Sequence, residues 1–376
     1  MSHKTAIVIG AGIVGLATAR ALSLAGYKVT VIERSEKAVG ASIRNFGMIW
    51  PIGQPEGLLF NRAIRSRQIW KDISDSTGMW YSESGSLHLA YQLDEWQVLE
   101  ELAELFQAEG RSVFLISAST IAARFPHIKQ KGLLGGLFST TEMIVNPRIA
   151  IPSVATYLEN FLDVEFIFKA QVTQVETGAA YIGDQKLEAD QIWVCSGQDF
   201  ETLFPNDFSN QPITRCKLQM MRFKSADQNF NIGTSICGGL SLVHYKSFAK
   251  ANGISRLAQR YESEMKEYID RGIHVMVSQN ESGQLTVGDS HEYGHSFEPF
   301  DSAHINQLIL SYLGQMLNYS DWQLEQSWHG IYPKMKNGAT EICLSPVNNV
   351  FILNGLGGAG MTLSFGLAEE MIKLYA

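Results

Sequence analysis

The first 33 residues join a short apolar segment to a glycine-rich turn, and this arrangement constrains the fold more than any other feature. Residues 5–9 have the sequence TAIVI, which is typical of a buried strand, and lead directly into GAGIVG. Residues 16–26 indicate a helix, and residues 28–32 indicate a second apolar strand that ends at Glu33. This order predicts a dinucleotide-binding unit: a strand, a G-x-G-x-x-G turn, a helix, and a second strand with an acid about 20 residues after the turn.

Each glycine of this turn meets a separate physical requirement. Gly10 permits the tight turn, Gly12 lets the backbone approach a pyrophosphate, and Gly15 lets the helix pack closely on the strand. The N-terminus of the helix offers free N–H groups and a partial positive charge to the phosphates. Glu33 can accept hydrogen bonds from a ribose 2′-hydroxyl and would repel a 2′-phosphate. We therefore expect a bound adenine dinucleotide.

Length, composition and charge limit the other possibilities. A chain of 376 residues is long enough for two domains, or for one α/β domain with a second one inserted. The net charge of −8 and the absence of a Lys/Arg cluster argue against nucleic-acid binding. No run of about 18 apolar residues exists, so no membrane span is expected. The four cysteines form no C-x-x-C pair, which favours free thiols and a cytoplasmic location.

A second glycine cluster lies near the end of the chain. Residues 349–353 (NVFIL) indicate a buried strand, and residues 354–362 (NGLGGAGMT) lead into a final helix. The apolar segment 191–194 also ends in a turn, at residues 195–197. Two strand–glycine–helix units at opposite ends of the chain imply that both termini build one nucleotide-binding domain.

The remaining pattern predicts the fold class and the domain boundaries. We expect an α/β fold: a Rossmann-type dinucleotide-binding domain with an inserted α+β substrate domain built on an antiparallel sheet. The dinucleotide-binding domain, which the resemblance described next implies is an FAD-binding domain, is predicted to be discontinuous and to comprise residues 1–84, 146–210 and 327–376. The substrate domain is predicted to comprise residues 85–145 and 211–326.

The two ends of the chain resemble the FAD-dependent amine-oxidising family that includes D-amino acid oxidase, glycine oxidase and monomeric sarcosine oxidase. The resemblance is carried by residues 10–15, Glu33-Arg34, residues 195–197, residues 330–333 (GIYP) and the glycine cluster at 355–366. It implies an FAD cofactor, a small-molecule amine substrate, and oxygen or another compound as electron acceptor. A narrower resemblance, carried by residues 40–51 (GASIRNFGMIWP), is to a subgroup whose implied substrates include aminophosphonates and N-methylated aminophosphonates.

The sequence departs from the sarcosine oxidases at two places. Those enzymes attach the flavin through a cysteine near the segment that corresponds to residues 330–333, whereas Cys343 lies too far along the chain. We therefore expect noncovalent FAD. They also hold the substrate carboxylate with a basic pair, and Met48 and Thr362 occupy those positions here. Either the anionic group is held elsewhere or the substrate differs.

Oxidation of an amine by a flavin depends mainly on positioning. A hydride leaves the carbon next to nitrogen for flavin N5, and the imine then hydrolyses. The start of the final helix, near Gly360, is suited to stabilise negative charge on the reduced ring, or its glycines only permit a tight turn. The resemblance implies as cofactor-binding residues Gly10, Ala11, Gly12, Ile13, Val14, Gly15, Glu33, Arg34, Ala41, Ser42, Arg44, Asn45, Phe46, Gly47, Met48, Val172, Ser196, Gly197, Gly330, Gly357, Gly358, Ala359, Gly360, Met361 and Thr362.

Several side chains are candidates for the substrate pocket, each with a purely structural alternative. Arg44 either binds the flavin or an anionic substrate group, or is a solvated loop residue. Tyr332 either covers the pocket or is a core tyrosine. Lys334 and His244 either reach the substrate or lie on the surface. Lys217, if it lies over the flavin, would stabilise forming superoxide. The candidate substrate-binding residues are Arg44, Met48, His244, Tyr332, Lys334 and Thr362, and the candidate catalytic residues are Tyr332 and Lys217.

The sequence favours an oxidase or dehydrogenase of a small primary or secondary amine, an amino acid or an aminophosphonate. An NAD-dependent dehydrogenase, which Glu33 permits, and a non-catalytic flavin-binding subunit of a larger complex are the alternatives. No metal site is expected, because His291, His295 and His304 have no ligand spacing with acids or cysteines.

Overall fold

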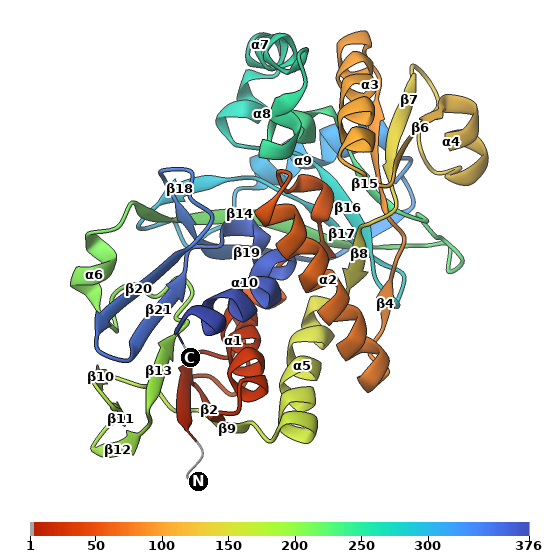
Figure 1. The fold of residues 1–376 in the computed structure, drawn as a ribbon. Coiled ribbons are helices and arrows are strands. Elements are labelled where there is room, and N and C mark those ends of the chain that lie inside the picture. The colour runs from red at the N-terminus through yellow and green to blue at the C-terminus, as the bar shows by residue number, and fades with distance from the viewer. Residues whose placement is uncertain (1–3, 376) are drawn as a thin grey trace.

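The computed structural model describes residues 4–375, and the first of its two large sheets is built from both ends of the chain (Figure 1). Within these residues the sheet has six strands in the order β20-β21-β13-β1-β2-β9. All neighbouring pairs are parallel except β20 and β21. The strands are β1 (Thr5–Ile9), β2 (Lys28–Glu33), β9 (Glu165–Phe168), β13 (Gln191–Val194), β20 (Ile342–Val347) and β21 (Val350–Asn354). The N-terminal and C-terminal strands are brought together because both β1 and β21 pair with β13.

Helices cover one face of this sheet. The helices α1 (Ile13–Leu24) and α10 (Gly360–Tyr375) pack against each other, and α2 (Leu58–Thr77) and α5 (Pro147–Leu162) pack beside them (Figure 1). Most residues of α1 are buried, because the helix lies between the sheet and its neighbours. A small antiparallel sheet lies elsewhere in the same part of the chain, formed by β10 (Gln174–Glu176), β11 (Ala179–Ile182) and β12 (Gln185–Glu188).

The second large sheet has nine strands among the described residues and is mostly antiparallel. Its longest pairing joins β14 to β19 along almost their whole length. The strands are β5 (Ser86–Ala90), β6 (Val113–Ser117), β7 (Gly135–Ser139), β14 (Ile213–Ser225), β15 (Ser235–Cys237), β16 (Met276–Gln279), β17 (Gln284–Gly288), β18 (Glu292–Gly294) and β19 (Trp322–Met335). The helices of this region, most of them at the top of Figure 1, are α3 (Leu93–Ala108), α4 (Ala118–Arg124), α7 (Ile254–Glu264), α8 (Lys266–Asp270) and α9 (Ala303–Met316).

Short elements connect the two large sheets. The strands β3 (Met48–Ile49), β4 (Tyr81–Ser82) and β8 (Met143–Val145) form a three-stranded sheet, and α6 (Pro205–Ser209) precedes β14. The strand β19 runs through position 326, which is the predicted end of the substrate domain. The exact domain boundaries remain a prediction. We propose that they separate the part of the chain that carries the parallel sheet from the part that carries the antiparallel sheet.

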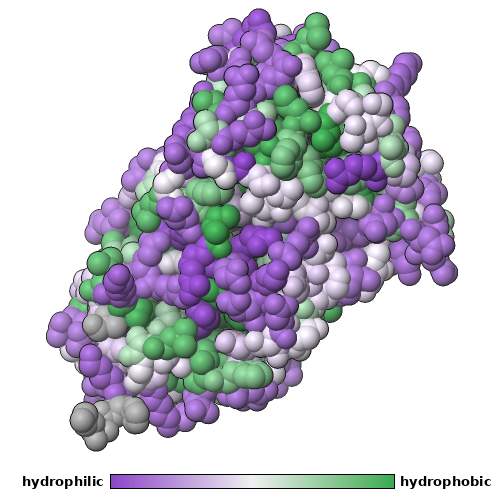
Figure 2. Space-filling model, turned by 45° about the vertical axis from the view of Figure 1, so that its right-hand side comes forward, coloured by the Kyte–Doolittle hydropathy of each residue, from purple (hydrophilic) through white to green (hydrophobic). Residues whose placement is uncertain are grey.

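The predicted fold class is confirmed: a parallel sheet with a dinucleotide-type turn is combined with a second, mainly antiparallel sheet. Each sheet has an apolar core of its own. On the face drawn in Figure 2, hydrophilic and hydrophobic residues are intermixed. Among residues 4–375, no helix combines the length and the apolar character that crossing a bilayer requires.

Candidate active site

The glycine turns from the two ends of the chain meet at the carboxyl ends of β1 and β21. A β-carbon added at Gly360, the first residue of α10, would lie 3.5 Å from Cγ2 of Ile13, the first residue of α1. The N-termini of both helices are therefore close together. Since helix N-termini carry free N–H groups and partial positive charge, this arrangement is suited to a ligand that has both phosphates and an electron-accepting ring.

Two glycines of the first turn are required by the packing. Gly10 has φ +105°, and an added β-carbon would lie 2.5 Å from the carbonyl oxygen of Cys195. At Gly15 an added β-carbon would lie 1.8 Å from the carbonyl oxygen of Gly10. Gly15 therefore holds α1 against the end of β1, as the sequence motif predicts.

A cavity of about 540 Å³ begins at these turns and reaches the second large sheet. Its volume is in the range of small-molecule sites. Among the predicted cofactor residues, those that line it are Gly10, Gly12, Ile13, Val14, Glu33, Arg34, Ala41, Ser42, Arg44, Asn45, Phe46, Met48, Val172, Ser196, Gly197, Gly330, Gly357, Gly358, Ala359, Gly360, Met361 and Thr362. Ala11, Gly15 and Gly47 are not among the lining residues.

Glu33 at the end of β2 supports the first turn. Its Oε2 accepts a hydrogen bond from the N–H of Ala11 at 2.9 Å, and its Oε1 accepts one from the N–H of Ser35 at 2.9 Å. A carboxylate oxygen has capacity for a second donor, so Glu33 can still accept ribose hydroxyls. Arg34 forms an ion pair with Asp199, with Nη1 and Oδ2 2.8 Å apart.

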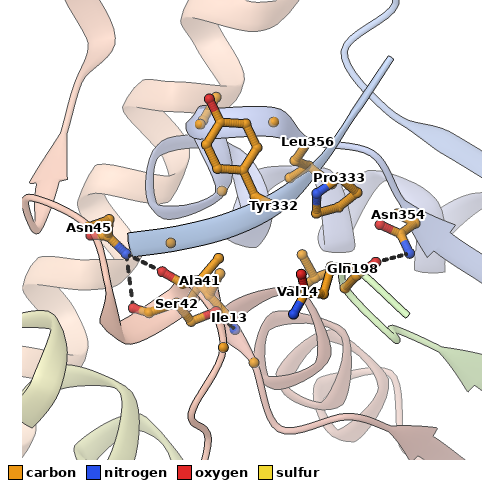
Figure 3. Close-up of a pocket in the computed structure, with 18 of the residues that line it drawn as sticks. Ile13, Val14, Ala41, Ser42, Asn45, Gln198, Tyr332, Pro333, Asn354 and Leu356 are labelled. Atoms are coloured by element: carbon orange, nitrogen blue, oxygen red, sulfur yellow. Dashed lines mark hydrogen bonds between the residues drawn. The ribbon is translucent and has the colours of Figure 1, made fainter. Parts of the chain in front are cut away.

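The loop at residues 41–47 forms the wall between the first turn and the second large sheet. Oγ of Ser42 accepts a hydrogen bond from the N–H of Ile13 at 2.9 Å. The side-chain amide of Asn45 donates to the carbonyl oxygens of Ala41 and Ser42, both at 3.0 Å (Figure 3). Gly47 has φ +74°, and an added β-carbon would meet a backbone oxygen at 1.9 Å. Asn45 and Gly47 therefore shape the loop.

The opposite wall comes from β19 and the glycines before α10. Figure 3 draws Tyr332 and Pro333 of β19 together with Ile13 and Val14 at the start of α1. A β-carbon added at Gly358 would lie 3.6 Å from the hydroxyl of Tyr332. Tyr332 is 6% exposed, and burial raises the pKa of its phenol well above the usual value, so the hydroxyl stays protonated. Tyr332 can therefore donate a hydrogen bond into the cavity.

The other candidate substrate residues line the same cavity as Tyr332. Met48 is buried, and Thr362 accepts a hydrogen bond from the backbone N–H of Trp50 at 2.9 Å. Nη1 of Arg44 donates to the carbonyl oxygen of His329 at 3.1 Å, which ties the loop to β19. The ammonium of Lys334 lies 3.4 Å from the hydroxyl of Tyr293 and is partly exposed.

The structure does not bring Lys217 to the cavity, and the interpretation of Lys217 as a group over the flavin is corrected. Alternate residues of a strand face opposite sides of a sheet, and Leu218 and Met220 of β14 line the cavity. Nζ of Lys217 donates to the carbonyl oxygens of Glu298 and Phe300 at 2.8 and 3.1 Å. The lysine therefore anchors a neighbouring segment.

Four ionisable residues gather in the cavity, and of these the sequence indicated His244 as a substrate candidate but gave no role to His274, Asp289 or His291. His244, His274 and His291 lie together, and each offers a nitrogen within 4.8 Å of the others. Burial lowers the pKa of His291 to about 4 and the pKa of the other two well below the usual value. Burial also raises the pKa of Asp289 well above its usual range. All four residues line the cavity.

The antiparallel pairing of β16 and β17 explains why these residues meet. Met276 is paired with Gly288, so His274 before β16 comes close to Asp289 and His291 after β17. His295 and His304, which follow His291 closely in the chain, are not part of this group. His304 is instead exposed and contacts Glu267 on α8. A sequence signal for this group does exist: two adjacent apolar segments, β16 and β17, have a polar residue at the end where they meet, His274 before β16 and Asp289 after β17.

Comparisons with known proteins agree with the fold. Residues 5–374 match the family described as "FAD dependent oxidoreductase" (DAO). The crystal structure of glycine oxidase from Bacillus cereus ATCC 14579 has a TM-score of 0.79 at 16% identity, covering 100% of this chain and 95% of that chain. L-proline dehydrogenase from P. horikoshii has a TM-score of 0.80 at 17% identity, with the same coverage.

A relative found by sequence matches only part of this chain. The tRNA 5-methylaminomethyl-2-thiouridine biosynthesis bifunctional protein MnmC of Burkholderia lata is 29% identical over 144 residues, covering 36% of this chain and 22% of that protein. The chain thus spans about a fifth of the length of this relative. The family match covers nearly the whole chain, and it excludes the NAD-dependent alternative that Glu33 alone permits. The chain belongs to the DAO family of FAD dependent oxidoreductases.

Proposed function

We propose that the protein oxidises a small primary or secondary amine that carries an anionic group, and that the product imine is hydrolysed by water. The substrates would be amino acids, N-methylated amino acids or aminophosphonates. The similarity to glycine oxidase and L-proline dehydrogenase supports an amine substrate, because the names of both proteins concern amino acids. The sequence resemblance at residues 40–51 supports the aminophosphonate class.

The observation that carries the proposal is the chemistry of the cavity beyond Tyr332. Met48 and Trp50 supply apolar contacts for a carbon skeleton, while Lys334 supplies a positive charge for an anionic group. The neutral hydroxyl of Tyr332 lies next to Gly358, one of the glycines before α10. A short substrate with an amine at one end and an acid at the other would be oriented by this pattern.

The residues around the cofactor would have positioning roles. FAD, when bound, supplies the acceptor for the hydride that leaves the carbon next to nitrogen. The turn at residues 10–15 and Glu33 would hold its phosphates and ribose. The N-terminus of α10 would favour negative charge on the adjacent ring. We further propose that the cofactor is noncovalent, because Cys343 lies on β20 and is not among the residues that line the cavity.

The proposal is tested by anaerobic reduction of the purified, FAD-loaded protein. Glycine, sarcosine, D-alanine, 2-aminoethylphosphonate and its N-methyl derivative are each added at saturating concentration, and loss of the oxidised flavin absorbance is followed. We expect at least one of these compounds to bleach the flavin, and the same compound without its acid group to need a higher concentration to reach half of the maximal reduction rate. Failure of every compound would contradict the proposed substrate class. Acid precipitation that leaves the flavin on the protein would contradict noncovalent binding.

A further inference from the structure

We propose that His244, His274 and His291 bind one divalent transition-metal ion at the substrate end of the cavity. Neutral imidazole nitrogens are among the commonest ligands for zinc and similar ions, and three histidines with an open position form a frequent type of site. The three side chains come from residues that are far apart in sequence, yet each offers a nitrogen within 4.8 Å of the others. Tetrahedral zinc with Zn–N distances of about 2.0–2.1 Å needs a closer approach of the three nitrogens, so the side chains would rotate toward the ion on binding.

The burial of the cluster supports an occupant of this kind. His274 is 4% exposed and His291 is 7% exposed. Nδ1 of His274 is buried and has no hydrogen-bond partner among residues 4–375. A buried polar atom without a partner is costly, so a ligand that accepts its lone pair would remove this cost. The rings of His244 and His274 pack directly against each other, with their centroids 3.7 Å apart and their planes 34° apart.

The surrounding groups orient the rings as outer-shell partners do in metal sites. Nδ1 of His291 lies 2.8 Å from the carbonyl oxygen of Gly272, which leaves Nε2 of His291 free for a metal. Nε2 of His274 lies 3.4 Å from Oδ1 of Asp289, which leaves the unpartnered Nδ1 free. Contacts of an imidazole with a backbone carbonyl and with a carboxylate are the two common arrangements around metal-bound histidines.

The ion would deepen the proposed function by binding the anionic group of the substrate, and this role rests on that proposal. Three protein ligands leave a fourth position open. The cluster lines the same cavity as Tyr332 and Lys334, and the rings of His291 and Tyr332 lie 6.5 Å apart. A carboxylate or phosphonate oxygen at the open position would therefore lie between a metal ion and the lysine. Met48 and Thr362, which replace the basic pair of the sarcosine oxidases, would then not need to hold this group.

The binding of the metal is tested independently of activity. FAD-loaded protein is treated with a chelator, dialysed and titrated with Co²⁺ alone, and the bound metal is measured by absorption and by elemental analysis. We expect one ion per chain. His274→Ala should weaken binding by more than the roughly 10- to 100-fold that loss of an outer-shell partner causes. Asp289→Asn should weaken it by about 10- to 100-fold. His304→Ala, at an exposed histidine of α9, is the matched control and should bind as the unchanged protein does.

Two results would overturn the metal site: no stoichiometric ion in the unchanged protein, or equal binding in the His274→Ala variant. His244→Ala provides a second variant if His274→Ala does not fold, because His244 is only partly buried. The FAD content of each variant reports folding. The proposed function fails separately, when no amine bleaches the flavin. A third result would also show that the metal assignment is wrong. If the chelated protein oxidises an acidic amine with unchanged KM, and the KM rises in the histidine variants, the histidines bind the anion directly.

Discussion

The two ends of the cavity are built in different ways. The proposed cofactor end is formed by short contiguous motifs within residues 10–15 and 355–362, at the N-termini of α1 and α10. The substrate end is formed by single side chains such as His244, His274 and Lys334, which come from separate strands and loops. A backbone site needs glycine at fixed spacing, whereas a side-chain site needs only that the fold bring chemically suitable residues together. The first kind of site is therefore visible in a sequence, and the second becomes visible in the structure.

Gly15→Ala should have the largest effect, because it places a methyl group against backbone at the cofactor end. The added β-carbon would lie 1.8 Å from the carbonyl oxygen of Gly10, so α1 would have to move away from β1. We expect a loss of about 3 kcal/mol in the free energy of unfolding and loss of flavin on gel filtration. Gly40→Ala is the matched control, since nothing lies within 4 Å of its added β-carbon. Equal stability and flavin content in the two variants would contradict the close helix–strand packing.

Lys334→Met should separate the substrate end from the cofactor end. A charge-assisted contact contributes about 1.5–3 kcal/mol, so the KM of an acidic amine should rise by about 10- to 100-fold while flavin content stays unchanged. Lys217→Met is the contrast, because its ammonium holds Glu298 and Phe300 outside the cavity. It should lower stability in urea and leave KM unchanged. A large KM change in Lys217→Met and none in Lys334→Met would reverse the assignment of these lysines.

Ser42→Ala should have the smallest effect and tests whether a side chain contributes at the cofactor end. Oγ of Ser42 accepts the N–H of Ile13 at the start of α1. Removing this acceptor should cost about 1 kcal/mol, or about fivefold in FAD affinity. The measurement is FAD titration of the apoprotein by fluorescence quenching. A loss as large as that in Gly15→Ala would mean that the side chain, and not the backbone, dominates the cofactor end.

The sequence predicted the parts of the molecule that depend on local pattern. The strand–turn–helix unit, the acid at Glu33, the second glycine cluster and the fold class all follow from short-range spacing, and the structure agrees on each. The exact domain limits are less predictable, because β19 belongs to the second sheet and still contributes Tyr332 and Lys334 to the cavity.

The remaining residues could not be predicted for physical reasons. The direction of Lys217 depends on which face of β14 meets the cavity, and Leu218 and Met220 reveal this only in the folded sheet. The meeting of His274 with Asp289 depends on the register of β16 against β17, which joins residues 15 positions apart. The residues of the histidine cluster come from separate segments, so no fixed sequence spacing relates all of them. Tertiary pairing therefore decides the candidate substrate site.

The long pairing of β14 with β19 has a consequence for how this protein can change over time. Leu218 and Gly330 form one pair of this ribbon, and Cys216 and Tyr332 form another. Deleting or inserting one residue in either strand would exchange the inward and outward side chains along the rest of that strand. Tyr332 would then be replaced in the cavity by a neighbour. New substrate preferences should therefore arise by exchange of residue type at fixed length along this ribbon, while insertions accumulate in the outer hairpins.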